Sequence, residues 1–306
     1  MKQKARKRNG VEHTATPYRG SKWQLWDWIE PYMRFPHQEF ADLFGGGGSV
    51  TICKPPVKLR VYNDLDGDAT NFFRQARDNF EELAWLLTMT PYGREEHESC
   101  RIKTGDETPV ELARKWFCSM WMSRSNSPFS GSGLKRQTAP DGKRVLPQAD
   151  FVNAKIAMVQ VAQVFQGVLI ENKDFRTIIQ EYQHPTALIY ADPPYLRSTG
   201  RDVDYNHDPK GEDEYALHSD LAELLHEAVG YRIVAGSPSQ EYADWYELRG
   251  WQRVDKEVRR DSNGKKKRSA TYIESMWLCP RVQAALNQNK QLNLFSLTGE
   301  ISDEEE

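Results

Sequence analysis

Residues 188–198, LIYADPPYLRS, combine an apolar run with a short group of residues that could hold a planar amine. The apolar run predicts a buried strand that stops at Asp192-Pro193-Pro194-Tyr195. The two prolines fix φ and remove backbone donors, so the turn should be stiff. The Asp192 carboxylate and the Pro193 carbonyl can accept both hydrogens of an exocyclic NH2 group, while the Tyr195 ring stacks on the heterocycle. A plain strand-terminating turn is the alternative, but the four residues together favour an amine site.

A second chemical feature is GGGGS at residues 45–49, which an engineer would use as a flexible linker. Here a predicted strand, residues 40–44, leads straight into the glycines, which let backbone approach a ligand closely. The next predicted strand, residues 59–62, runs into Asp64, and a carboxylate there can accept from ribose hydroxyls. An Asn-Asp turn is the structural alternative for Asp64. Since the carboxyl ends of parallel strands share one edge of a sheet, we expect the glycines, Asp64 and Asp192 to meet at a ligand loop.

Strands that alternate with helices must position these residues, which predicts an α/β fold with a mostly parallel sheet. A final antiparallel pair would make the sheet mixed. The predicted strands are residues 40–44, 59–62, 167–171, 186–191, 232–235, 251–259 and 271–279. The predicted helices are residues 21–33, with Ser21 as N-cap, 50–52, 68–87, 110–122, 150–165, 217–229 and 242–249.

DPPY after an apolar strand resembles the catalytic motif of N6-adenine methyltransferases that use S-adenosylmethionine. The motif order, with the glycine loop first, then an insertion, then DPPY, resembles the Dam-like, alpha-class DNA adenine methyltransferases from about residue 18 to residue 280. This resemblance implies a Rossmann-like methyltransferase fold whose mixed sheet carries an inserted, mostly helical target-recognition domain. It also implies methyl transfer from S-adenosylmethionine to a flipped-out adenine in duplex DNA, without a metal, with Asp192, Pro193, Pro194 and Tyr195 as the catalytic residues.

The resemblance also implies a set of cofactor-binding residues. Residues 18–22, YRGSK, are similar to the family's aromatic-x-Gly-Gly-Lys, with serine in place of the second glycine, and residues 42–49 resemble its acidic-x-Phe-x-Gly-x-Gly-Ser loop. The pattern is completed after the second strand by an acidic residue, Asp64, and a packing residue, Leu65. It also includes an Asp-aromatic pair beside the cofactor adenine, Asp174-Phe175. The implied residues are Tyr18, Lys22, Asp42, Phe44, Gly46, Gly48, Asp64, Leu65, Asp174 and Phe175.

Four parts of the chain are expected. Residues 1–15 form a basic flexible arm, residues 16–88 and 166–280 the catalytic domain, residues 89–165 the target-recognition insertion, and residues 281–306 a C-terminal tail. The insertion resembles the family only loosely, so the recognition sequence stays open. Basic loops in the insertion and between the last two strands predict DNA contacts, with solvated loops as the alternative. The candidates are Arg124, Lys135, Arg136, Lys143, Arg144, Lys265, Lys266, Lys267 and Arg268.

The tail is expected to leave the core after Pro280, yet it carries the apolar segment QLNLF. This segment resembles the peptide with which bacterial replication proteins bind the sliding clamp. Gln291 would donate or accept hydrogen bonds, and Leu292, Leu294 and Phe295 would supply the apolar contacts. A strand docked on the chain's own domain is the alternative.

Composition excludes several other classes. The four cysteines are scattered without CxxC spacing, which argues against a zinc site or a disulfide framework and fits a reducing cytoplasm. Neither a secretory h-region nor a membrane-length apolar run is present. RNA adenine methylation, N4-cytosine methylation and an inactive DNA-binding or clamp-tethered accessory protein stay open as alternatives. Asp192 and the large insertion favour DNA adenine methylation, and whether a restriction partner exists is left undecided.

Overall fold

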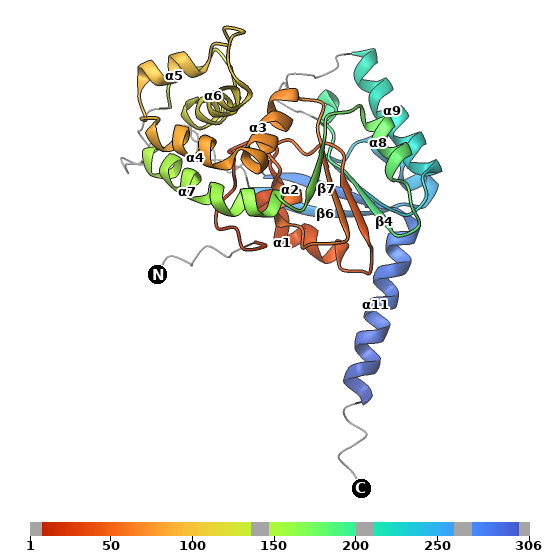
Figure 1. Ribbon diagram of the computed structural model, residues 1–306. Coiled ribbons are helices and arrows are strands. Elements are labelled where there is room, and N and C mark those ends of the chain that lie inside the picture. The colour runs from red at the N-terminus through yellow and green to blue at the C-terminus, as the bar shows by residue number, and fades with distance from the viewer. Residues whose placement is uncertain (1–7, 136–146, 200–210, 260–270, 300–306) are drawn as a thin grey trace.

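A central twisted sheet carries helices on both sides, as Figure 1 shows, and a group of helices extends from one end of it. The computed structural model describes residues 8–135, 147–199, 211–259 and 271–299, the last ten of these by their backbone alone. Within these residues, no helix is both long and apolar enough to cross a membrane.

The sheet has seven strands in the order β3-β2-β1-β4-β5-β7-β6. Five neighbouring strands are parallel, and β7 is antiparallel to both β5 and β6. The mixed α/β sheet predicted from the sequence is therefore confirmed. The strands are β1 (Glu39–Asp42), β2 (Leu59–Asn63), β3 (Val168–Glu171), β4 (Ala187–Ala191), β5 (Tyr231–Gly236), β6 (Gln252–Arg259) and β7 (Thr271–Leu278).

Most predicted helices form, but one is divided. The predicted helix at residues 68–87 becomes two, because Asn79 leaves helical geometry at φ −129° and ψ 40°. Two short helices, α5 and α8, were not predicted. The helices are α1 (Trp26–Ile29), flanked by the 3-10 turns η1 (Lys22–Leu25) and η2 (Glu30–Met33), α2 (Ser49–Cys53), α3 (Gly67–Asp78), α4 (Phe80–Met89), α5 (Arg94–Cys100), α6 (Pro109–Met122), α7 (Pro147–Phe165), α8 (Phe175–Tyr182), α9 (Glu212–Glu227), α10 (Gln240–Trp245) and α11 (Pro280–Gly299).

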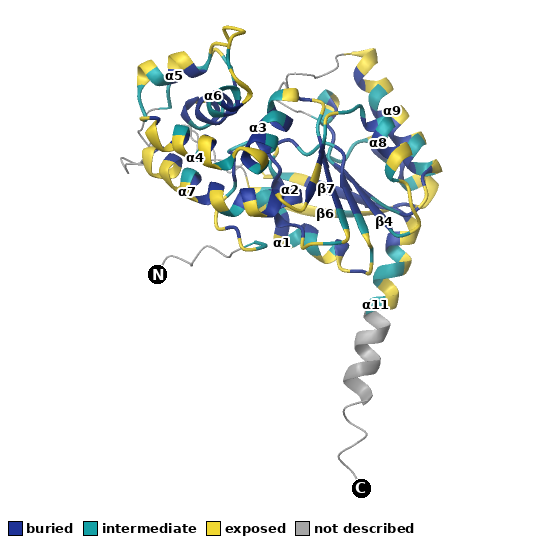
Figure 2. Cartoon of the chain, viewed as in Figure 1, coloured by how far each residue is buried: buried dark blue, intermediate teal, exposed yellow. Residues whose placement is uncertain are grey.

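The helices within residues 89–165, the segment predicted as the insertion, share an apolar core with α3, β2 and β3. Phe72 of α3 stacks on Trp116 of α6, with ring centroids 4.7 Å apart, and Phe73 stacks on Phe165 of α7 at 4.3 Å. Figure 2 shows the buried stripe along α3, α6 and α7. The insertion therefore rests on α3 and the β2 side of the sheet, so its position relative to the active site is fixed by packing.

Two expectations about the ends of the chain are wrong. Residues 8–15 are not a flexible arm, because Val11 and Ala15 are fully buried and the Asn9 amide donates to the Ile52 and Lys54 carbonyls. Residues 1–7 lie outside the described residues.

The chain also does not leave the core directly at Pro280, since α11 begins there and its first turns pack on the core through Val282, Ala285 and Leu286 before the helix projects outward (Figure 1). The QLNLF segment lies within this helix, so the alternative of a docked strand is excluded. The described part of α11 projects from the body of the molecule (Figure 1).

Candidate active site

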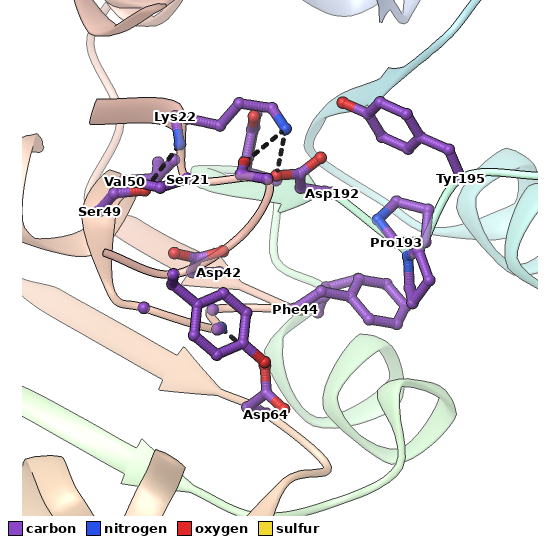
Figure 3. Close-up of a pocket in the computed structure, with 18 of the residues that line it drawn as sticks. Ser21, Lys22, Asp42, Phe44, Ser49, Val50, Asp64, Asp192, Pro193 and Tyr195 are labelled. Atoms are coloured by element: carbon purple, nitrogen blue, oxygen red, sulfur yellow. Dashed lines mark hydrogen bonds and ion pairs between the residues drawn. The ribbon is translucent and has the colours of Figure 1, made fainter. Parts of the chain in front are cut away.

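A cavity of about 580 Å³ opens at the carboxyl ends of β1, β2 and β4. In the strand order, β1 lies between β2 and β4, and crevices outside such strand ends are where open α/β sheets bind ligands. The cavity brings together every predicted catalytic and cofactor-binding residue except Gly48. These are Tyr18, Lys22, Asp42, Phe44, Gly46, Asp64, Leu65, Asp174, Phe175, Asp192, Pro193, Pro194 and Tyr195, several of which Figure 3 shows.

The glycine loop is packed tightly rather than loose. A Cβ on Gly45 would lie 2.2 Å from the Tyr62 ring, and one on Gly48 would lie 2.6 Å from the Phe73 ring. Gly48 also has φ +70°, which L-residues seldom adopt. The Tyr62 hydroxyl donates to the Gly46 carbonyl over 2.7 Å. The glycines therefore let the loop lie flat on aromatic rings, and Gly48 faces those rings instead of the cavity.

Two carboxylates follow the ends of the neighbouring strands. Asp64 accepts from the backbone N–H of Gly46 at 2.7 Å and from that of Asp66 at 2.8 Å, which fixes its orientation. Asp42 is buried and accepts from the Thr51 hydroxyl at 2.8 Å. Burial raises the pKa of Asp42 to about 7, and the nearby Asp192 and Asp64 carboxylates add to this rise. This part of the cavity is therefore acidic and suited to a cationic ligand.

Lys22 joins the DPPY turn to a carboxylate that the sequence did not single out. Its Nζ lies 2.8 Å from Asp192 Oδ2 and 3.1 Å from Glu274 Oε1 (Figure 3 shows the lysine and its contacts). The Tyr195 hydroxyl donates to the same Glu274 oxygen. Burial raises the pKa of Asp192, and the Lys22 ammonium acts in the opposite direction. Glu274 on β7 thus holds both Lys22 and Tyr195 in place.

Asp192 Oδ1 is buried and has no hydrogen-bond partner among the described residues. A buried carboxylate oxygen without a donor is costly, and this atom lines the cavity, where it can accept from a ligand that enters. On the other side of the turn, His218 Nε2 lies 2.9 Å from the Pro194 carbonyl and therefore carries a proton that it donates. The His218 ring stacks on Trp245, so the turn is supported from α9 and α10.

Sequence reasoning missed Glu274 and His218. A signal existed for Glu274, because it is the only charged residue in the strand TYIESMWL and strands buried at one end rarely accommodate a carboxylate without a partner. His218 gives no such signal, since histidine is common on helices and only the fold brings it to Pro194.

Few of the predicted DNA-contacting residues can be placed. Arg124 is exposed, and its Nε donates to the Leu134 carbonyl at 3.2 Å. Lys135 is half-buried, its Nζ lies 3.1 Å from Asn126 Oδ1, and burial lowers its pKa, so it stabilises its own loop. The remaining candidates, Arg136, Lys143, Arg144, Lys265, Lys266, Lys267 and Arg268, lie outside the described residues, as do the side chains of Gln291, Leu292, Leu294 and Phe295.

Comparison with known proteins agrees with this arrangement. Residues 18–261 match the family model of D12 class N6 adenine-specific DNA methyltransferases. The chain is also 26% identical over 245 residues to the type II methyltransferase M1.LlaDCHI of Lactococcus lactis subsp. cremoris, with 75% of this chain and 82% of the relative covered. These matches favour DNA adenine methylation over the RNA, cytosine and inactive alternatives. Because the family model spans most of the chain, the protein belongs to the D12 class of N6 adenine-specific DNA methyltransferases and is an adenine-specific DNA methyltransferase.

Proposed function

We propose that the cavity binds S-adenosylmethionine beside a flipped-out adenine, and that Asp192 receives the adenine amino group. The observation that carries the proposal is the buried, unpartnered Oδ1 of Asp192, which lines the same cavity as the glycine loop and Tyr195. When bound, S-adenosylmethionine supplies a methyl group on a positively charged sulfur. The acidic residues Asp42 and Asp64 fit such a cationic donor, and a cavity of this size suits a ligand of its dimensions.

Several residues have the surroundings that the cofactor roles require. The half-exposed Leu65 offers an apolar surface next to Asp64, to which we assign the ribose hydroxyls. The rings of Phe44 and Phe175 lie 5.6 Å apart at the cavity wall, where they suit an adenine. Asp174 accepts from the Arg176 backbone N–H at the start of α8, so it contributes first to capping that helix.

The target adenine enters from the DPPY side. Asp192 Oδ1 and the Pro193 carbonyl accept the two N6 hydrogens, which turns the nitrogen lone pair towards the methyl group. Tyr195 stacks on the base and offsets part of the cost of unstacking it from the duplex. The N6 nitrogen becomes acidic as it gains the methyl group, so Asp192 then takes its proton. Lys22 and Glu274 keep Asp192 and Tyr195 positioned, and such placement of acceptors supplies most of the rate.

We also propose contacts outside the cavity. The exposed Arg124 and the basic segments at residues 136–144 and 265–268 suit DNA phosphates.

QLNLF in α11 suits a bacterial sliding clamp, and a pull-down with the full chain and with Leu294→Ala tests that partner. We assign the protein to the cytoplasm, where a bacterial chromosome or phage DNA would meet it.

Methylation sequencing tests the reaction and the site together. The chain is expressed in a bacterial host that lacks adenine methylation, with Asp192→Asn as the matched variant. We expect N6-methyladenine at one recognition sequence with the native chain and none with the variant, because the amide cannot accept the proton. Unmodified DNA with the native chain, or full methylation with Asp192→Asn, would contradict the proposed site.

A further inference from the structure

Three arginines contact the loop at residues 123–134, which follows α6, and one of them, Arg124, belongs to the loop itself. Each donates to a backbone carbonyl of that loop, and none has a carboxylate partner within the part of the chain that the structure describes. The pairs are Arg19 with Ser125 at 2.5 Å, Arg101 with Ser132 at 3.2 Å and Arg124 with Leu134 at 3.2 Å. Five other arginines pair with carboxylates, namely Arg77, Arg114, Arg176, Arg249 and Arg253. Three more, Arg60, Arg232 and Arg281, also donate to backbone carbonyls, but at separate places in the fold. The loop therefore carries uncompensated positive charge.

Only Arg19 of these three lines the cavity. Arg19 occupies the second position of a turn in which the Ser21 N–H donates to the Tyr18 carbonyl at 3.2 Å. Gly20 takes the third position with φ +74°, a value that favours glycine. The turn therefore presents Arg19 between Tyr18, which packs on the glycine loop, and Lys22, which contacts Asp192. The Arg19 guanidinium therefore reaches from the cavity to Ser125 in the loop at residues 123–134.

The geometry points to Arg19 as a ligand of the DNA backbone: we propose that its guanidinium binds a phosphodiester directly flanking the flipped adenine. This inference rests on the proposed position of the adenine at Asp192. The Nε–H is used by the Ser125 carbonyl, which holds the planar group in one orientation. Among the described residues the Nη atoms make no hydrogen bond, so their four N–H donors can match two phosphate oxygens. Arg19 lines the same cavity as Asp192 and precedes Lys22, which contacts Asp192, so a base held at Asp192 would bring its phosphates near this side of the cavity.

Salt dependence separates a phosphate ligand from a structural tether. DNA affinity of the native chain, Arg19→Lys and Arg19→Gln is measured between low and moderate salt, on a duplex carrying the sequence found by methylation sequencing. Arg19→Gln keeps an amide that can reach Ser125 but loses the charge. We expect its affinity to fall about tenfold and its slope of log affinity against log salt to become shallower by about 0.9. Arg19→Lys, which keeps the charge, should retain the native slope.

A neutral phosphate in the DNA locates the contact. One methylphosphonate replaces the phosphate on the 5′ or the 3′ side of the target adenine. One of these two duplexes should lower the DNA affinity of the native chain to that of Arg19→Gln on the unmodified duplex. The same methylphosphonate should leave the DNA affinity of Arg19→Gln unchanged. Arg101→Gln is the matched control, because Arg101 also donates to the loop but does not line the cavity. Any loss of DNA affinity in Arg101→Gln should add to the loss that the methylphosphonate causes.

Two results would overturn the inference: equal salt slopes for the native chain and Arg19→Gln, or additive losses for Arg19→Gln and both methylphosphonates. S-adenosylmethionine affinity is measured for every variant. If the native chain neither binds that cofactor nor methylates the unmodified duplex, the proposed function fails first, and the two failures are thereby told apart.

Discussion

Asp42 should make the binding of a cationic methyl donor depend on pH. Its carboxyl is buried, and its pKa is raised to about 7, chiefly by desolvation. A positive ligand favours the ionised form, so below the pKa a proton must leave before the ligand binds well. At pH 5.5 the protonated form exceeds the ionised form by about 30 to 1, and at pH 7.5 the ionised form prevails. We expect S-adenosylmethionine affinity to fall about 25-fold from pH 7.5 to pH 5.5.

Isothermal titration calorimetry measures this affinity, and the proton released at pH 5.5 follows from repeats in buffers of different ionisation enthalpy. Asp42→Asn removes the titrating group and should give weak affinity that changes little over the same range. Asp192→Asn is the comparison variant, because it keeps Asp42 and removes a nearby carboxylate that raises the pKa of Asp42. Its profile should persist with the midpoint moved to lower pH. A flat profile for the native chain, or an unchanged slope in Asp42→Asn, would refute the assignment of the pH dependence to Asp42.

Three further perturbations test the packing and electrostatics around the cavity. Gly48→Ala should lower the free energy of unfolding by about 1–3 kcal/mol in urea titrations, since φ is +70° and the added Cβ meets the Phe73 ring. The control is Gly131→Ala, whose added Cβ meets open space and should leave the free energy of unfolding nearly unchanged. Glu274→Gln should reduce the rate constant of methyl transfer about 10-fold to 100-fold in single-turnover assays, because Tyr195 and Lys22 lose their shared anion. A weaker cofactor affinity with an unchanged rate constant would contradict this role. Without ligand, Asp42 holds its proton in the folded chain up to about pH 7 but releases it near pH 4 in the unfolded chain, so the free energy of unfolding should fall as the pH rises from about 4 to about 7. Asp42→Asn should lessen this fall in thermal melts. An equal fall in both chains would show that other groups cause it.

The chemistry of the site was predictable because it sits on short segments next to strand ends. Asp192–Tyr195 and the glycines each follow an apolar run, and parallel strands bring such segments to one edge without any detailed knowledge of packing. Glu274 could not be placed in the same way. It lies 79 residues after Tyr195, and its neighbours depend on β7 inserting between β5 and β6 rather than at the sheet edge.

The wrong expectations share a physical cause. Residues 8–15 are rich in polar groups, and two small side chains among them, Val11 and Ala15, are buried in the apolar cluster that includes α3, α6 and α7. Such a fit depends on surface shape and leaves no periodic pattern in the sequence. The same holds for α11, a mostly polar segment whose first turns are anchored by Val282, Ala285 and Leu286.

The distribution of charge around the cavity also bears on the order of events in the proposed reaction. Lys22 compensates the two carboxylates of Asp192 and Glu274 only in part. Two further carboxylates, Asp42 and Asp64, stand at the adjoining strand ends of the same cavity. A donor with a positive sulfur is attracted to this acidic wall before transfer. After transfer the sulfur is neutral, so the same carboxylates no longer favour the product, and the pKa of Asp42 should return toward 7. The acidic wall therefore favours substrate over product by the one charge that the reaction removes.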